Sequence, residues 1–232
     1  MISPLSIVLP CLNEGAGIAA TLTALNPLRE RGVEVVVVDG GSSDDTPARA
    51  APLADRVITA PRGRASQMNA GADAARGSVL LFLHADCRIP ADADRLVIDG
   101  LAASVRRWGR FDVAFDGDHP CMRVVACMMN WRSRLTGIAT GDQGIFIERA
   151  LFLAQGGFPV IPLMEDIALC TRLKVLDPPL CLSSRITTSA RRWEQRGIFR
   201  TILLMWRLRA AYRLGVDPAK LALRYDSVRQ RY

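Results

Sequence analysis

Residues 33–41 read VEVVVVDGG, and this stretch decides the fold. The four consecutive valines at 35–38 show no alternation of polar and apolar side chains, which is typical of a strand buried on both faces in a parallel sheet. The strand ends at Asp39, and the glycine- and carboxylate-rich segment 40–46 predicts a turn that caps the following helix. The stretch therefore predicts an α/β protein with a central parallel sheet.

The sequence on both sides of this strand continues the pattern. Short apolar segments at 6–9 and 79–83 predict two more buried strands, and residues 56–59 allow another. Helices are expected between them, at 15–27 and 65–75. This alternation of strands and helices predicts an open, mostly parallel sheet flanked by helices.

Polar residues follow three of the predicted strands, at 10–14, 39–45 and 84–86. Because the ligand crevice of an open α/β sheet lies outside the carboxyl ends of its strands, we expect these clusters to gather at one edge. A carboxylate such as Asp86 at that edge suits Mg²⁺ or Mn²⁺, which complete their coordination with phosphate oxygens and water. The alternatives are that Asp86 only caps the segment after its strand and that Asp39 belongs to an ordinary Asp-Gly turn.

The composition narrows the class of protein. Of the 232 residues, 50% are apolar and 23% are charged, which suits a folded globular protein and not a disordered or disulfide-rich one. The six cysteines form no CxxC pair and the two histidines argue against a zinc enzyme, so reduced thiols in a cytoplasmic protein are expected. The sequence shows no secretory signal and no apolar stretch long enough to span a membrane.

The formal charge of +7 is unevenly distributed. Residues 185–232 contain 12 basic and 3 acidic residues, so this tail carries +9 and the rest of the chain −2. Such a tail fits nucleic acid, a membrane surface or a phosphorylated substrate. Its predicted helix, 197–214, has one apolar side and one arginine-rich side, so it either packs on the body or lies on anionic lipid. The apolar side consists of Ile198, Ile202, Met205 and Trp206.

The second half of the chain is less regular. Strands are expected at 111–115 and 144–147, and helices at 119–136, 149–155 and 165–176. No repeat and no low-complexity linker interrupts the sequence. We therefore expect a single domain, 1–232, that ends in a basic helical extension over 194–232.

Several of these segments together resemble family 2 glycosyltransferases, in particular a small bacterial branch found beside radical-SAM and selenium-related genes. The resemblance rests on motifs in the family's order, namely SIVLPCLNE (6–14), VDGGSSDDT (38–46), FLHAD (82–86), GDQG (141–144), MED (164–166) and SARRW (189–193). It implies a GT-A fold and an inverting transfer from a nucleotide-activated sugar. Residues 1–110 would then bind the nucleotide-sugar, and residues 111–193 would form the acceptor side.

The resemblance also implies roles for individual residues. Asp166 would be the general base that takes the proton of the acceptor hydroxyl, with Glu165 beside it. Asp86 would bind Mg²⁺ or Mn²⁺, with His84 as a candidate second ligand. The nucleotide would bind a set drawn from the first three motifs and the helix after them: Pro10, Glu14, Asp39, Arg64 and Asp86. The diphosphate and the acceptor would bind residues of the distal motifs: Asp142, Gln143, Arg191, Arg192 and Trp193.

Two of these assignments have plain structural alternatives. The pair Glu165-Asp166 can be an acidic first helical turn that favours the helix dipole, and the segment 191–193 can be a solvated basic stretch with one packed aromatic. The sequence also departs from the family, since His84 replaces the first acid of the DXD motif and the glutamine of the QxxRW motif is missing. Without membrane-spanning segments, a single-transfer enzyme is expected rather than a polysaccharide synthase.

These observations predict a cytoplasmic enzyme, with the inner face of the membrane as the place where its tail would act. The expected partners are a UDP-sugar donor and an acceptor that is small or lipid-linked; no nucleic acid is expected, because the tail lacks a recognition motif. One alternative is a nucleotidyltransferase of the same architecture, although the segment 10–14 lacks the basic glycine-rich loop of that class. The other is a non-catalytic membrane-surface adaptor that uses the basic tail.

Overall fold

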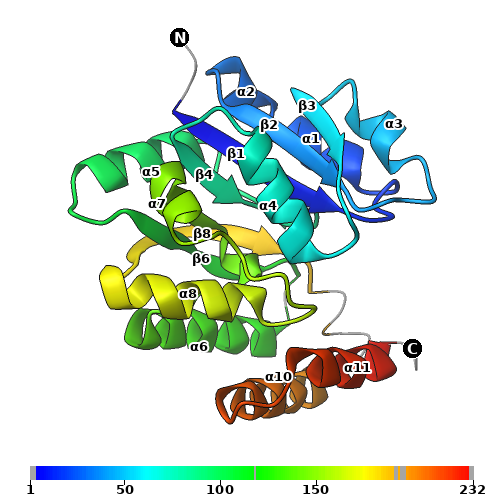
Figure 1. Ribbon diagram of the computed structural model, residues 1–232, viewed down its shortest axis with the longest axis vertical. Helices are drawn as coiled ribbons and strands as arrows, with labels where there is room; N and C mark the ends of the chain where they lie inside the picture. Colours follow the sequence, from blue (N-terminus) through cyan, green and yellow to red (C-terminus); the bar gives the residue numbers. More distant parts are fainter. Residues whose placement is uncertain (1–3, 118, 191–192, 194–196, 230–232) are drawn as a thin grey trace.

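The computed structural model describes residues 4–117, 119–190, 193 and 197–229, which form a sheet with helices on both faces (Figure 1). In these residues eight strands make one sheet, in the order β3-β2-β1-β4-β7-β6-β8-β5. They are β1 (Leu5–Cys11), β2 (Glu34–Asp39), β3 (Arg56–Thr59), β4 (Val79–Phe82), β5 (Cys87–Arg88), β6 (Trp108–Phe115), β7 (Ile145–Glu148) and β8 (Leu180–Thr188). The predicted α/β class is confirmed.

The valine-rich strand β2 lies between β1 and β3 and runs parallel to both. Every residue of β2 is buried, as the sequence predicts. Val36 and Val38 pack on the side of α4 (Arg64–Ala74), whereas Val35 and Val37 pack on the side of α1 (Ile18–Ala24). Helices therefore cover this strand on both faces, which is why it shows no polar alternation.

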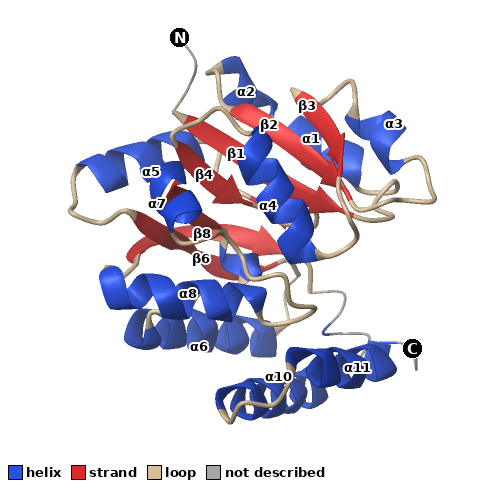
Figure 2. Ribbon diagram, viewed as in Figure 1, coloured by secondary structure: helices blue, strands red, loops and turns tan. Residues whose placement is uncertain are grey.

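Two groups of helices cover the two faces of the sheet (Figure 2). One face carries α4, α7 (Arg149–Ala154) and α8 (Glu165–Leu176). The other face carries α1, α2 (Asn26–Glu30), α3 (Thr46–Ala50) and α5 (Ala93–Ala102). Helix α6 (Pro120–Thr136) packs against β6.

The structure differs from the expectation at several elements. Neither α5 nor β8 is predicted, and β8 lies between β6 and β5, parallel to β6 and antiparallel to β5. The first predicted helix does not run unbroken to residue 27. It ends at Ala24, and α2 begins with Pro27 in its first turn, where the missing N–H of proline is not needed.

The C-terminal extension forms α10 (Ile198–Arg213) and α11 (Pro218–Arg229), which pack on each other (Figure 1). Leu208 of α10 and Leu221 of α11 are buried and join the core on the α4 face. Ile198 and Ile202 pack on a smaller cluster, but Trp206, expected on the packed side, is 58% exposed. In the part of the chain that the structure describes, no helix combines the length and the apolar character that crossing a membrane requires.

Candidate active site

The polar segments that follow β1 and β2 interlock at one edge of the sheet. The Asn13 N–H donates to Ser42 Oγ at 2.9 Å, and the Ser43 N–H donates to Asn13 Oδ1 at 2.8 Å. The Glu14 N–H donates to Thr46 Oγ1 at 2.8 Å. Both ends of the segment 39–46 are thus tied to the segment 10–14, and the two form one preformed surface.

Two residues predicted to bind the nucleotide, Pro10 and Asp39, lie at the ends of neighbouring strands. Pro10 is paired with Val38 in the ladder between β1 and β2. The side chain of Asp39 accepts hydrogen bonds from the Gly41 N–H (2.9 Å), the Ser42 N–H (3.0 Å) and the Ser42 hydroxyl. The buried Asp39 carboxylate therefore shapes this loop in addition to being a candidate ligand group.

The segment after β4 meets the acceptor-side motif 141–144 at His84. His84 Nδ1 lies 3.3 Å from Asp142 Oδ1. Gly141 lies so close to the ring that a Cβ on it would be 2.3 Å from both Cε1 and Nε2 of His84. This contact brings the first half of the predicted site and its second half together.

The end of β4 also offers ligands for a divalent cation. Ligand atoms of His84, Asp86 and Cys87 lie within 4.8 Å of one another. Asp86 is exposed, whereas Cys87 is buried, and this burial raises the pKa of its thiol well above the usual range. A protonated thiol is a poor ligand, but an exposed carboxylate beside an imidazole suits Mn²⁺ or Mg²⁺ that also binds phosphate oxygens. The residues present therefore fit the predicted cation, with Asp86 as the carboxylate ligand and His84 as the second.

The carboxylates Glu165 and Asp166 form the first turn of α8. Asp166 Oδ1 accepts a hydrogen bond from the Ile167 N–H at 2.7 Å, and its Oδ2 accepts one from the Gly141 N–H at 3.1 Å. The turn that carries Asp142 therefore contacts both His84 and Asp166. The acidic first turn also favours the helix dipole, as the structural alternative requires, so the two interpretations are compatible.

The surroundings of this pair give it the character of a base. Burial raises the pKa of Asp166 and of Glu165. The hydrogen bonds from the N–H groups of Ile167 and Gly141 oppose the rise at Asp166, and the positive charge of Arg64 opposes it at both carboxylates. A carboxylate whose pKa is above the usual range takes a proton more readily near neutral pH than an ordinary aspartate does. The chemistry of Asp166 therefore suits proton abstraction.

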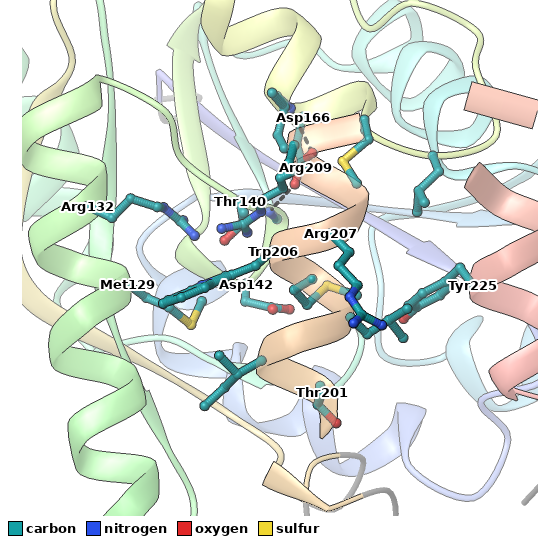
Figure 3. Close-up of a pocket in the computed structure, with 18 of the residues that line it drawn as sticks. Met129, Arg132, Thr140, Asp142, Asp166, Thr201, Trp206, Arg207, Arg209 and Tyr225 are labelled. Atoms are coloured by element: carbon teal, nitrogen blue, oxygen red, sulfur yellow. Dashed lines mark hydrogen bonds between the residues drawn. The ribbon is translucent and has the colours of Figure 1, made fainter. Parts of the chain in front are cut away.

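These carboxylates open into a cavity of about 770 Å³ (Figure 3). Its walls are formed by α6, by α8 with the segment 140–142, and by α10. Arg64, at the start of α4, also lines it; desolvation disfavours the charged guanidinium, but the negative charges of the cavity, Glu165 foremost, outweigh this and raise the pKa of Arg64. One cavity thus contains residues from both halves of the predicted site.

The remaining predicted residues have different surroundings. Trp193 lines the cavity, and its ring packs edge-on against Phe115 with centroids 5.5 Å apart. Gln143 is fully buried, where its amide approaches the Thr140 N–H and the Asn130 side chain, so it supports the wall from behind. Arg191 and Arg192 lie outside the described residues.

Arg132 is expected on a helix with no function attached, and the structure places its side chain in the cavity (Figure 3). A signal was present in the sequence, because Arg132 continues an otherwise mostly apolar helical stripe through Val125 and Met129. Four arginines of α10, expected on the side opposite the apolar residues of this helix, line the same cavity: Arg200, Arg207, Arg209 and Arg213. Their position depends on how α10 packs, which no motif indicates.

Residues 6–144 match the family model described as Glycosyl transferase family 2. The chain belongs to this family. The matched region includes the interlocked loops, the segment 84–86 and the motif 141–144, whereas Glu165 and Asp166 lie beyond it. Membership of glycosyl transferase family 2 favours the glycosyltransferase interpretation over a nucleotidyltransferase or an adaptor.

Known proteins of similar sequence and fold agree with this family. An uncharacterized glycosyltransferase of Mycobacterium tuberculosis is 36% identical over 134 residues, which are 56% of this chain and 59% of that protein. The mannosyltransferase PcManGT from Pyrobaculum calidifontis, in complex with GDP-Man and Mn²⁺, has a TM-score of 0.67 at 22% identity, over 97% of this chain and 65% of its own. S. aureus TarS 1–349 in complex with UDP-GlcNAc has a TM-score of 0.64 at 16% identity, over 82% and 58%. These structures show the GT-A fold, and this chain spans between 58% and 65% of the length of the three proteins.

Proposed function

We propose that this chain is a metal-dependent, inverting glycosyltransferase that moves a sugar from a UDP-sugar to an acceptor hydroxyl. The observation that carries the proposal is the turn at 141–142, which contacts the cation-binding segment through His84 and the candidate base through Asp166 in one cavity. Donor and acceptor can therefore be held together in the orientation that transfer requires.

The donor is assigned to residues 1–110. Pro10, Glu14 and Asp39 bind the nucleoside at the interlocked loops. The diphosphate is assigned to Arg64 and to the segment 191–193, because a planar guanidinium matches phosphate oxygens better than an ammonium does. A Mg²⁺ or Mn²⁺ ion at Asp86 and His84 would supply positive charge to the departing diphosphate when bound.

The transfer step is assigned to Asp166. The acceptor oxygen attacks the anomeric carbon on the face opposite the diphosphate, so a new carbon–oxygen bond forms as the bond to the diphosphate breaks with its electron pair. Asp166 takes the proton of the acceptor hydroxyl, and attack on the opposite face inverts the configuration. Glu165 is the second carboxylate of the site. Asp142 faces the acceptor, and Gln143 holds the turn from behind.

Two of the structural neighbours support a nucleotide-sugar donor and a divalent ion. TarS is in complex with UDP-GlcNAc, and PcManGT is in complex with GDP-Man and Mn²⁺. The proposal takes a uridine nucleotide as the donor and a small or lipid-linked compound as the acceptor. It places the chain in the branch of the family found beside radical-SAM and selenium-related genes.

Nucleotide binding tests the proposal. Thermal unfolding is measured with UDP, GDP, dTDP and their sugars, each with and without Mn²⁺. UDP with Mn²⁺ should raise the melting temperature more than UDP alone, and a ligand at 100 times its Kd stabilises the folded state by about 2.7 kcal/mol. The proposal fails if none of these nucleotides or nucleotide-sugars binds at millimolar concentration.

We also assign the chain to the cytoplasmic face of a membrane, with no nucleic-acid partner. Exposed apolar side chains stand on both helices beside the cavity: Trp131 (66%) and Leu135 (72%) on α6, and Phe199 (79%) and Trp206 (58%) on α10. Aromatic side chains next to arginines suit the interface of anionic lipid, and α10 can present them while Leu208 packs on the body. The chain should sediment with vesicles of phosphatidylglycerol and phosphatidylcholine, and Phe199→Glu should weaken this; equal binding to phosphatidylcholine alone contradicts the assignment.

A further inference from the structure

Arg132 is a cation in the cavity that makes few hydrogen bonds with the described part of the chain. Its Nε and Nη2 atoms are buried, and neither has a hydrogen-bond partner among the described residues. Desolvation, together with the like charges of Arg110 and Arg213, lowers the pKa of Arg132. A guanidinium nevertheless remains protonated in proteins, so its buried, unpaired donors carry a free-energy penalty that a bound anion would remove.

The position of Arg132 is fixed by its helix. Two residues earlier, the Asn130 side chain donates to the Val113 carbonyl at 3.0 Å and accepts from the Val113 N–H at 2.8 Å, which ties this turn of α6 to β6. From there Arg132 extends toward the centre of the cavity (Figure 3). The negative charge of Asp166 acts on it, but no hydrogen bond joins the two among the described side chains. The charge of Asp166, the proposed base, therefore acts on Arg132 without using its hydrogen-bond donors.

The rest of the cavity combines apolar walls with an excess of positive charge. Met128 and Met129 of α6, Leu163 before α8 and Trp206 of α10 all line it. The carboxylates that line it are Asp142, Glu165 and Asp166, and the arginines are twice as many: Arg64, Arg132, Arg200, Arg207, Arg209 and Arg213. A space of about 770 Å³ with this lining suits a ligand that has an apolar body and more than one negative charge.

We infer that the acceptor is an amphipathic compound that carries a phosphate group in addition to the hydroxyl that Asp166 deprotonates. Its phosphate group binds Arg132, and its apolar body lies along Met128, Met129 and Trp206. This inference rests on the proposed function, because it takes the cavity beside Asp166 as the acceptor side of the reaction. It accounts for an arginine at a helix position where apolar residues otherwise face the cavity.

Binding of three probes tests the inference. Octyl phosphate, octanol and inorganic phosphate are each titrated against the full chain with UDP and Mn²⁺ present, at concentrations below micelle formation, and binding is followed by calorimetry. Octyl phosphate should bind at least about tenfold more tightly than either of the other two, because only octyl phosphate offers both the anion and the apolar body. Equal affinity for octanol overturns the anionic part of the inference, and equal affinity for inorganic phosphate overturns the apolar part.

Two variants on α6 localise the site. Arg132→Gln should weaken octyl phosphate about tenfold to hundredfold and leave octanol unchanged. Arg123→Gln is the matched control, since Arg123 is exposed on the same helix and does not line the cavity, and it should bind like the original chain. The melting temperature without ligand separates binding from structure: removing an unpaired buried charge should leave it unchanged or raise it. A lowered melting temperature with unchanged octyl phosphate affinity overturns the inference.

The nucleotide arm separates this inference from the proposed function. If UDP with Mn²⁺ does not bind, the proposed function fails, while Arg132-dependent binding of octyl phosphate to the chain alone can still be measured. If UDP instead displaces octyl phosphate from the cavity, Arg132 belongs to the donor diphosphate and the inference about the acceptor is overturned.

Discussion

The buried charge in the loops after β1 and β2 differs from the one on α6, at the cavity wall, in the hydrogen bonds that the protein gives it. In the loops, the Asp39 carboxylate is buried and accepts hydrogen bonds from Gly41 and Ser42. On α6, Arg132 is desolvated, and two of its nitrogens have no partner among the described residues. The loop side is thus hydrogen-bonded within the protein, whereas the α6 side keeps a charged group that a ligand can satisfy.

The difference separates a buried charge whose hydrogen bonds the protein already supplies from one whose hydrogen bonds are left to a ligand. Removing a satisfied buried group leaves its former partners unpaired and lowers stability. Removing an unsatisfied group breaks no hydrogen bond of the folded protein, so we expect it to change ligand binding and not to lower stability. Variants of Asp39 and of Arg132 are therefore expected to affect different measurements.

The largest effect is expected for Asp166→Asn. Loss of the general base should lower the rate of sugar transfer about 10²- to 10⁴-fold, while UDP binding at the loops remains. The measurement is the initial transfer rate with Mn²⁺ and saturating donor. Asp99→Asn changes an exposed carboxylate of α5 and is the control that should transfer at the original rate. If Asp166→Asn transfers the sugar at the original rate, Asp166 is not the general base and the reaction does not take place on this side of the molecule.

The second-largest effect is expected for Asp39→Ala, which removes the hydrogen-bonded carboxylate of the loops after β1 and β2. The N–H groups of Gly41 and Ser42 lose their acceptor, so the free energy of unfolding should fall by about 2–3 kcal/mol, and UDP affinity should fall with it. Denaturant unfolding and UDP titration measure both. Asp45→Ala in the same loop removes only an exposed ion pair with Arg49 and should cost about 0.5 kcal/mol or less. If both variants lose the same free energy of unfolding, the buried hydrogen bonds of Asp39 stabilise the fold no more than the exposed ion pair of Asp45 does.

A smaller effect is expected for Asn130→Ala on α6, at the cavity wall. The variant leaves the N–H and carbonyl of Val113 unpaired, so the free energy of unfolding should fall by about 1–2 kcal/mol. Because Asn130 fixes the turn that carries Arg132, octyl phosphate should bind more weakly, while UDP affinity should be unchanged. Loss of UDP affinity in place of octyl phosphate affinity would show that the two sides are not separate.

The smallest effect is expected in the pH dependence of Arg64→Gln. Burial raises the pKa of Asp166, and the N–H groups of Ile167 and Gly141 and the charge of Arg64 oppose the rise; Glu165 is the adjacent carboxylate. Transfer needs deprotonated Asp166, so the rate should fall as the pH drops through a pKa above the ordinary value of about 3.9. Without Arg64 this acidic limb should move to higher pH, as measured by kcat against pH. A shift to lower pH would contradict the assignment.

The same raised pKa values have a consequence for stability. Because the folded-state pKa of this carboxylate pair lies above the unfolded value, the folded state binds more protons in the window between them. The contribution of the pair to the free energy of unfolding should therefore increase as the pH falls through the folded-state pKa. Glu165→Gln should flatten this part of the stability profile.

The sheet and the nucleotide-side loops could be predicted because they follow from local pattern. Four valines without polar alternation define β2, and polar residues directly after an apolar strand lie at its end in any parallel sheet. The contact between the segments 10–14 and 39–46 needs only this rule. The contact between His84 and Asp142 could not be derived in this way, because it joins two segments 58 residues apart.

The other features depend on tertiary packing, which cannot be predicted from a short segment of sequence. Strand β8 mixes apolar, serine and arginine residues and is largely half-exposed, so its sequence lacks a clear strand pattern and its pairing with β6 and β5 makes it a strand. The arginines of α10 read as a solvated face on a helical wheel, yet α10 packs so that they line the cavity. The lack of partners for Arg132 Nε and Nη2 among the described residues likewise depends on how α6, α8 and α10 surround the cavity, and not on the neighbours of Arg132 in sequence.

Positions 84 and 141 have room for only one side chain between them. A Cβ on residue 141 would be 2.3 Å from two atoms of the His84 ring, and this ring is only 14% exposed and faces Asp142. Any larger residue at 141 must therefore displace the imidazole unless residue 84 becomes smaller at the same time. Replacement of Gly141 alone should therefore be resisted, whereas its replacement together with a smaller residue at 84 should be tolerated.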